Sequence, residues 1–310
     1  MIPFFSARDV EAAVTPKRAY DSVRDAFVAH ARGEWTMLPK LYVTNYPAGD
    51  FRAMPALGGG HALLKWVTSF PGNPERGLPT VSGLVILSDA ETGLVEAVLD
   101  AGSVTALRTG AAAVLAAETL EASSGVASVI GVGVNGRAAA RTFKALGRDV
   151  LLWDVDEERA RAAAADLGVG LARTLDEALA ADAVVTVTPG RTILIPEGSL
   201  RPGQHVSLMG ADGPGKAEIA VAELQRGRIF CDEWEQASHG GELAAAVKAG
   251  VIERGDVTEL GSVLTRDVDG RRSADEITIF DSTGLAIQDL AIAIAAYERA
   301  GELDLPTMDL

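Results

Sequence analysis

The sequence predicts an α/β protein with a Rossmann-type doubly wound sheet domain and a second, α+β domain. A glycine-rich turn joins a short apolar run to an alanine-rich helical pattern between residues 127 and 146. From there on, short apolar runs alternate with helical segments, as in a parallel sheet covered by helices. Most of the first hundred residues instead have the pattern of antiparallel strands. The chain of 310 residues is long enough for two domains of ordinary size.

The glycine-rich turn has the order of a dinucleotide-binding motif. Residues 126–130 form the apolar run, and Gly131, Gly133 and Gly136 follow in the spacing G-x-G-x-x-G. In such a turn the first glycine permits the tight bend, and the second lets the backbone approach a pyrophosphate. The third glycine lets helix and strand pack closely. The motif by itself is weak evidence, because glycine-rich turns also occur without a ligand.

A second strand supports the motif. A strand is predicted at residues 149–153, and Asp154 follows it directly, 18 residues past Gly136 (154 − 136). An acidic residue near this spacing suits the ribose 2′-OH of NAD and repels the 2′-phosphate of NADP. An incidental surface acid is the alternative, and Arg159 or Arg161 on the next helix could reach a phosphate. The sequence therefore favours NAD as the cofactor.

Composition excludes several classes of protein. The formal net charge of −15 argues against nucleic acid as a partner, and it is equally compatible with a solubility role. The single cysteine, Cys231, permits no internal disulfide, and we expect it to be buried at a strand end. The four histidines lack metal-ligand spacing, so no metal site is expected. With neither a signal-peptide pattern nor an apolar run of about 18 residues, we expect a cytoplasmic protein without a membrane span.

The predicted elements of the first domain begin with a helix from Pro16 to Arg32, capped by Thr15. Strands are expected at residues 38–46, 51–54, 62–68, 81–87 and 94–99, with turns at 47–50, 58–60 and 89–93. Ser103 is expected to cap a long helix, residues 104–120, that leads into the glycine-rich turn. We place the first domain at residues 1–115, completed by 284–310, and the dinucleotide-binding domain at 116–283.

The second domain is expected to contain a parallel sheet. Its strands are predicted near residues 126, 150, 184, 206, 229 and 277, where the apolar runs are short and continuous. Helices are predicted at 157–167 and 175–181. A last helix at 285–300 should return to the first domain.

Two loops follow predicted strands, at residues 186–190 and 209–216, where ligands of doubly wound sheets bind. Asp212 is the only acid in the second loop. Beside a nicotinamide it could accept or donate a proton if burial raised its pKa toward neutrality. The alternative is an aspartate that hydrogen-bonds its own Gly-Pro turn.

The first domain contributes two candidate cations. Lys65 lies within an apolar strand, where a charge is costly unless it is paired, and a buried lysine can act as an acid or base. Arg52 is suited to bidentate capture of a carboxylate. Each could instead be a surface cation, Arg52 on an edge strand and Lys65 with its alkyl stem along the surface.

These residues belong to longer stretches through which the chain resembles the ornithine cyclodeaminase/mu-crystallin family over nearly its whole length. The matching stretches are FRAMPA (51–56), LLKWVTSFPGNPERGLPTV (63–81), SVTALRTGAAA (103–113), GVGVNG (131–136), GADGPGK (210–216) and DEITIFDSTGLAIQDLA (275–291). Within the family, the sequences of these stretches are most similar to those of the archaeal-type alanine dehydrogenases.

The resemblance implies roles for individual residues. Arg52 would hold the substrate carboxylate, Lys65 would be the catalytic acid or base, and Asp212 would handle protons near the nicotinamide. Arg108 would face substrate or pyrophosphate. The implied cofactor-binding residues are Thr80, Thr109, Gly131, Gly133, Val134, Asn135, Gly136, Asp154, Thr188, Met209, Gly210, Ala211, Lys216 and Ser282.

The resemblance also implies an activity: NAD-dependent oxidative deamination of a small L-amino acid, with L-alanine as the first choice. Ornithine cyclodeaminases have an acidic residue where this chain has Ala53 and commonly a cysteine where it has Gly213, which counts against ornithine cyclisation. The resemblance is also compatible with ketimine reduction and with a cofactor-binding role without turnover. The implied assembly is a homodimer in which the first domains form a shared barrel.

Overall fold

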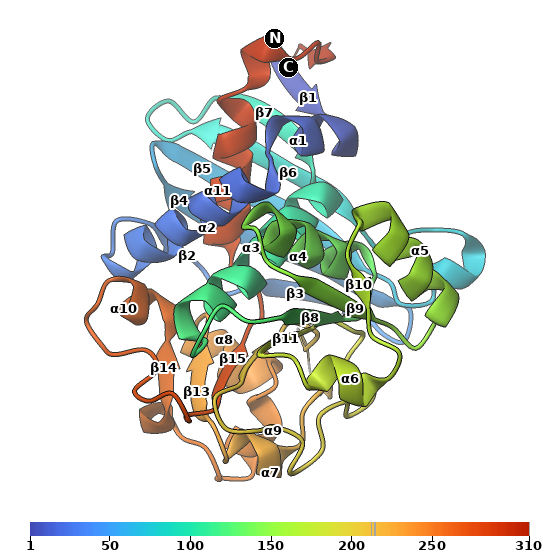
Figure 1. The fold of residues 1–310 in the computed structure, drawn as a ribbon. Helices are drawn as coiled ribbons and strands as arrows, with labels where there is room; N and C mark the ends of the chain where they lie inside the picture. The colour runs from blue at the N-terminus through green and yellow to red at the C-terminus, as the bar shows by residue number, and fades with distance from the viewer. Residues whose placement is uncertain (212, 214, 310) are drawn as a thin grey trace. The chain divides into compact units, whose positions relative to one another are not determined.

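The computed structural model describes residues 1–309 apart from Asp212 and Pro214, and Figure 1 shows its elements. The chain has two compact units: unit 1 comprises Met1–Arg108 and Leu285–Leu310, and unit 2 comprises Thr109–Gly284. Unit 1 combines a mainly antiparallel sheet with helices, and unit 2 has a parallel sheet with helices. The predicted fold class is confirmed. The division falls inside helix α3 (Ala101–Leu120), after Arg108 rather than after residue 115.

The sheet of unit 1 has the strand order β16-β1-β7-β6-β5-β4-β2, with β3 also paired to β4. Only the β1–β7 pair is parallel. The two chain ends lie side by side (Figure 1), because β1 pairs with β16; the sequence predicted neither strand. The strands are β1 (Ile2–Phe5), β2 (Thr36–Met37), β3 (Leu41–Asn45), β4 (Gly49–Gly58), β5 (His61–Ser69), β6 (Val81–Asp89), β7 (Val95–Asp100) and β16 (Thr307–Met308).

The helices of unit 1 differ in two places from the prediction. Helix α2 (Pro16–Ala31) begins as predicted, with the Thr15 hydroxyl accepting the Arg18 N–H. Helix α3 begins at Ala101, so Ser103 is not its cap; the Asp100 carboxylate accepts the Ser103 N–H at 2.7 Å. A short helix, α1 (Ala7–Ala13), was not predicted.

Helix α11 (Ala286–Tyr297, red in Figure 1) packs against α2 and strands β4, β5 and β6. The 3-10 turns of this unit are η1 (Asn73–Arg76) and η3 (Ala300–Glu302).

Unit 2 is built on eight parallel strands in the order β10-β9-β8-β11-β12-β15-β13-β14. The strand order reverses between β8 and β11, so the carboxyl ends of these strands border the ligand crevice of a doubly wound fold. Both β10 and β14 are too short to have been predicted. The strands are β8 (Ala127–Ile130), β9 (Val150–Trp153), β10 (Gly170–Leu171), β11 (Ala183–Thr186), β12 (His205–Leu208), β13 (Arg228–Cys231), β14 (Val257–Glu259) and β15 (Thr278–Asp281).

Helix α3 and helix α4 (Val134–Ala145) approach each other closely. A Cβ on Gly110 of α3 would lie 2.6 Å from the carbonyl carbon of Ala138 in α4, so only glycine permits this approach. Cys231 is buried at the end of β13, as predicted, and burial raises the pKa of its thiol. The helices are α4 (Val134–Ala145), α5 (Glu157–Leu167), α6 (Leu175–Leu179), α7 (Val221–Leu224), α8 (Trp234–Gly240), α9 (Ala244–Lys248) and α10 (Leu260–Leu264), with the 3-10 turn η2 (Arg254–Asp256). None of the helices in the described residues is long and apolar enough to cross a membrane.

Candidate active site

The glycine-rich turn of unit 2 has the geometry that a pyrophosphate requires. Gly131 directly follows strand β8 and has φ +98°, a conformation that favours glycine. A Cβ on Gly136 would lie 1.8 Å from the Gly131 carbonyl oxygen, whereas a Cβ on Gly133 would meet nothing within 4 Å. Gly133 is also the N-cap of α4, and no side chain caps the helix. The turn therefore offers open space beside the N–H groups that begin a helix, which fits a dinucleotide phosphate.

Asp154 follows strand β9 and lies next to this turn. Its carboxylate accepts the Val132 N–H at 2.8 Å, the Asp156 N–H at 3.0 Å and the Arg159 guanidinium at 2.6 Å. Burial by itself would raise the pKa of Asp154, but these hydrogen bonds outweigh it and lower the pKa. The residue is therefore a carboxylate at neutral pH, as an acceptor for ribose hydroxyls should be. Arg159 was predicted as a possible phosphate contact and is instead held in this ion pair.

Five of the other ten predicted cofactor residues lie at the carboxyl ends of the parallel strands. Thr188 follows β11, Ser282 follows β15, and residues 209–211 follow β12. The Ser282 hydroxyl donates to the Asp232 carboxylate at 3.0 Å. Lys216 lies farther along the loop that follows β12. Val134 and Asn135 begin helix α4 in unit 2.

The remaining predicted site residues have different positions. Thr109 lies within α3, and its buried hydroxyl oxygen has no hydrogen-bond partner among the described residues. Thr80 belongs to unit 1, where it precedes β6, and its carbonyl accepts the Phe70 N–H. Asp212 lies outside the described residues, so its proposed proton-transfer role stays a prediction.

Glu218 organises the loops after β11 and β12, and it was not predicted from the sequence. Its fully buried carboxylate accepts four hydrogen bonds: the Thr186 hydroxyl at 2.7 Å, the Thr188 N–H at 2.8 Å, the Thr188 hydroxyl at 2.5 Å and the Gly210 N–H at 3.0 Å. Burial raises the pKa of Glu218, and the four hydrogen bonds oppose that change. The sequence signal was available: an acid two residues past Lys216, in an otherwise apolar stretch.

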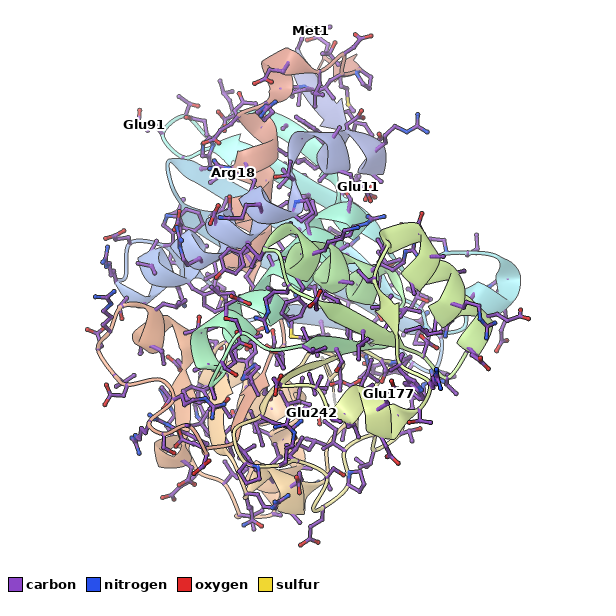
Figure 2. The ribbon with its side chains drawn as sticks, viewed as in Figure 1. Met1, Glu11, Arg18, Glu91, Glu177 and Glu242 are labelled. Atoms are coloured by element: carbon purple, nitrogen blue, oxygen red, sulfur yellow. The ribbon has the colours of Figure 1, made fainter. Side chains whose placement is uncertain are left out.

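A second buried acid supports Glu218. Glu242, labelled in Figure 2, lies between α8 and α9, and its carboxyl group accepts the backbone N–H of Glu218 at 2.8 Å. Burial and the neighbouring charges of Asp281 and Glu218 raise the pKa of Glu242 to about 9. Glu242 is therefore protonated near neutral pH.

Unit 1 brings together three predicted substrate residues. Strand β4 pairs with β5 so that Met54 lies opposite Lys65, and Arg52 lies opposite Val67 on the same face. Arg52 and Lys65 are thus diagonal neighbours on that face. Helix α3 adds Arg108, whose Nε lies 3.5 Å from an Asp289 carboxylate oxygen.

Lys65 is almost completely buried, at 1% exposure, and its Nζ donates to Asp289 Oδ1 at 2.8 Å. The pKa of Lys65 is lowered to about 8: burial is the largest cause, Arg108 and Arg52 act in the same direction, and Asp289 opposes them. A lysine that titrates near neutral pH can exchange protons with a substrate amine. The surface-cation alternative for Lys65 is therefore wrong. Asp289 was not predicted from the sequence.

Arg52 is buried as well and is paired within its own strand. Its Nε donates to Asp50 Oδ1 at 2.6 Å, and its guanidinium lies 5.3 Å from the centroid of the Tyr42 ring. The i, i+2 spacing places Arg52 and Asp50 on one face of β4. The alternative of an exposed edge-strand cation is therefore wrong for Arg52 also.

The fold and these sites define an oxidoreductase with a Rossmann-type dinucleotide-binding unit. The model of the ornithine cyclodeaminase/mu-crystallin family matches residues 3–303, and the chain belongs to this family. The resemblance inferred from the sequence is confirmed.

Individual relatives show the range of the family. An alanine dehydrogenase from Archaeoglobus fulgidus is 44% identical over 302 residues, covering 94% of this chain and 93% of the relative. An iminosuccinate reductase from Paracoccus denitrificans is 34% identical over 309 residues, covering 94% and 95%. The solved structure of an archaeal alanine dehydrogenase dimer with bound NAD superposes with a TM-score of 0.91 at 41% identity, covering 97% of this chain and 96% of that one. Ornithine cyclodeaminases and pyrroline-2-carboxylate reductases are also among the relatives.

Proposed function

We propose that this protein is an NAD-dependent amino-acid dehydrogenase that converts L-alanine, NAD and water reversibly into pyruvate, ammonia and NADH. The observation that supports this most directly is the buried Lys65, beside Arg52 and Arg108 in unit 1. Binding a cofactor without turnover does not require a buried cation, and burying a cation costs free energy of folding. The alanine dehydrogenase relative at 44% identity and the NAD-bound solved structure support the substrate and the cofactor.

In this proposal the dinucleotide is held by unit 2. The turn at Gly131–Gly136 would receive the pyrophosphate and Asp154 the adenine ribose, and Thr188, residues 209–211, Lys216 and Ser282 would surround the remaining groups. NAD supplies a hydride acceptor when it is bound.

The residues of unit 1 would hold the amino acid. The Arg52 guanidinium binds the α-carboxylate, with Arg108 adding a second positive charge. Neutral Lys65 Nζ accepts a proton from the substrate ammonium, which leaves a free amine. Loss of hydride from Cα then yields the iminium.

Hydrolysis of the iminium requires a water molecule. We assign its activation to Asp212 together with Lys65: Asp212 takes one proton from the water as its oxygen attacks the imine carbon, which gives a carbinolamine. Protonated Lys65 returns its proton to the amino group, which departs as ammonia while the hydroxyl loses its proton to solvent and forms the carbonyl of pyruvate. General acid–base help of this kind contributes about 10²–10⁴-fold to a rate.

We also propose that the protein works as a homodimer that assembles through the outer face of the unit 1 sheet. This face is apolar yet exposed: Leu64 is 41%, Trp66 43% and Leu84 45% exposed. The β5–β6 register places Trp66 directly opposite Leu84. Apolar patches of this kind usually mark interfaces, and the archaeal alanine dehydrogenase structure is described as a dimer.

The dimer is tested by measuring the molar mass in solution with light scattering. The wild type should have twice the chain mass, and the double variant Trp66→Glu/Leu84→Glu should have the mass of one chain. A variant with unchanged mass, or a monomeric wild type, would reject this interface.

The activity is tested with purified protein and NAD by following NADH absorbance with L-alanine or L-ornithine. Steady NADH growth with alanine supports the dehydrogenase. Proline and ammonia formed from ornithine without net NADH would assign the cyclodeaminase instead. If both are absent, NADH consumption with iminosuccinate or a cyclic ketimine would assign a reductase, and no turnover at all would favour a binding protein.

A further inference from the structure

A buried cluster in unit 1 contains an acid that the proposed mechanism does not use. Asp289 is completely buried on helix α11, and its Oδ1 accepts the Lys65 Nζ donor at 2.8 Å. Arg108 Nε lies 3.5 Å from the same oxygen. The other oxygen, Oδ2, has no hydrogen-bond partner among the described residues. A completely buried aspartate costs the fold free energy unless it is paired, so its presence calls for an explanation.

The charges around Lys65 come from strand β4 and from helices α3 and α11. Strand β4 contributes Arg52, which is itself paired with Asp50, and helix α3 contributes Arg108. Strand β6 places Val85 opposite Lys65 and adds no charge there. Helix α11 contributes Asp289. Lys65 thus faces two cations, and Asp289 is the carboxylate that contacts it directly.

We propose that Asp289 is a positioning residue for Lys65: it aims the Lys65 amine and supplies the counter-charge that lets this amine hold a proton in a buried site. The inference rests on the proposed function of Lys65. Without Asp289 the ammonium form would be buried beside Arg108 and Arg52 with no directly bonded anion. Lys65 would then exist as a free amine over most of the working pH range and would have nothing to hold its direction.

The test compares Asp289→Asn with a matched control on the same helix. Glu298→Gln makes the same carboxylate-to-amide change at the exposed C-cap of α11, where Glu298 pairs with Arg18. Two quantities are measured for each protein: the pH dependence of kcat for alanine oxidation, and the titration of Lys65 by NMR in protein labelled with [ε-¹³C]lysine. The Lys65→Arg spectrum assigns the Lys65 signal.

In D289N we expect the Lys65 midpoint to fall by about one unit or more, while E298Q keeps the wild-type midpoint. At pH 9, where Lys65 is mostly unprotonated in both proteins, kcat of D289N should still be roughly tenfold to hundredfold lower because the amine is misdirected. NADH affinity should not change. An unchanged Lys65 midpoint in D289N would overturn the proposal, as would a loss of kcat that is explained entirely by a lower folded fraction.

The NMR titration keeps this inference separate from the proposed function. If the wild type oxidises no amino acid, the dehydrogenase assignment fails, yet the Lys65 midpoint still reports whether Asp289 governs its proton. If D289N does not fold, the double variant Lys65→Met/Asp289→Asn replaces it. That variant should fold, because it removes both members of the Lys65–Asp289 ion pair and leaves no charged partner of the pair unpaired. A double variant that is no more stable than D289N would contradict the pairing of Lys65 with Asp289.

Discussion

Lys65 shows how a single strand position can specify chemistry. Strand β5 alternates buried and exposed side chains, and Lys65 occupies a buried position between Leu63 and Val67. An apolar residue at this position would give a more favourable free energy of folding, because a buried amine loses its hydration. Burial, with Arg108 and Arg52, lowers the pKa of Lys65 to about 8, which brings its proton exchange into the working pH range.

We expect alanine oxidation to rise with pH, with a midpoint near 8, because only neutral Lys65 can take the substrate proton. Lys65→Met should lower kcat by about 10²–10⁴-fold and abolish this limb of the pH profile. NADH binding, measured by fluorescence, should be unaffected. Lys17→Met removes a surface lysine that pairs with Asp21 and should retain full activity. A K65M enzyme with wild-type turnover would refute the assigned role.

Asp154 and Arg159 form the second pair whose chemistry can be tested at this scale. Their ion pair at 2.6 Å engages Arg159, which could otherwise bind a 2′-phosphate. We predict that Asp154→Ser weakens NAD and improves NADP, shifting the kcat/KM ratio of the two cofactors by roughly tenfold to hundredfold, which is the value of one or two charge-assisted hydrogen bonds.

The control for this prediction is the double variant Asp154→Ser/Arg159→Ala. It should lose NAD affinity without gaining NADP, because no guanidinium remains to meet the phosphate. Equal NADP use by the single and double variants would show that Arg159 takes no part.

At the scale of elements, the ends of β11 and β12 are held together by buried acids. Glu218 receives hydrogen bonds from Thr186 and Thr188 on one side and from Gly210 on the other, and Glu242 accepts the backbone N–H of Glu218. Backbone N–H groups that would otherwise lie unpaired in a buried loop are thereby satisfied. The arrangement gives these loops a stability that depends on protonation.

The dependence can be predicted from Glu242. Its carboxyl group has an ordinary pKa of 4.5 and a pKa of about 9 in the folded protein. Between these values the folded chain binds a proton that the unfolded chain lacks, so this group's contribution to the unfolding free energy is greatest below pH 4.5 and is lost as pH rises toward 9. Glu242→Gln should therefore flatten the fall in Tm between pH 6 and pH 9.

Glu157→Gln provides the comparison, because Glu157 is an exposed acid of unit 2 paired with Arg161. Its Tm profile should follow the wild type. If the E242Q profile is as steep as that of the wild type, Glu242 does not hold the extra proton.

For the whole molecule, local patterns predicted most of the fold. The G-x-G-x-x-G turn, the alternating strands and helices of unit 2, and the hairpins of unit 1 all have signals within about twenty residues of sequence. The missed elements are short or depend on distant partners: β16 has two residues, and β1 pairs with it from the other end of the chain. Such strands form because tertiary contacts stabilise them, not because of their own propensity.

The candidate site divides in the same way. Lys65 could be singled out because a cation is unusual within an apolar strand, Asp154 because of its spacing from the glycine-rich turn, and Arg52 because its side chain suits a carboxylate. Asp289 could not, since its partner Lys65 lies 224 residues away in the sequence. Glu218 meets Thr186 across 32 residues. The sequence could mark Glu218 as an acid in an apolar stretch, but the partners of these buried acids become apparent only when the fold brings them together.

The central claim is that this chain oxidises an amino acid with NAD. The most direct test is NADH absorbance at pH 9 with purified wild-type protein, NAD and L-alanine, run beside the K65M variant. We predict continuous NADH formation with an equal amount of pyruvate in the wild type, and at least about a hundredfold less in K65M. Wild-type protein that binds NADH yet forms no NADH from alanine would contradict the assignment.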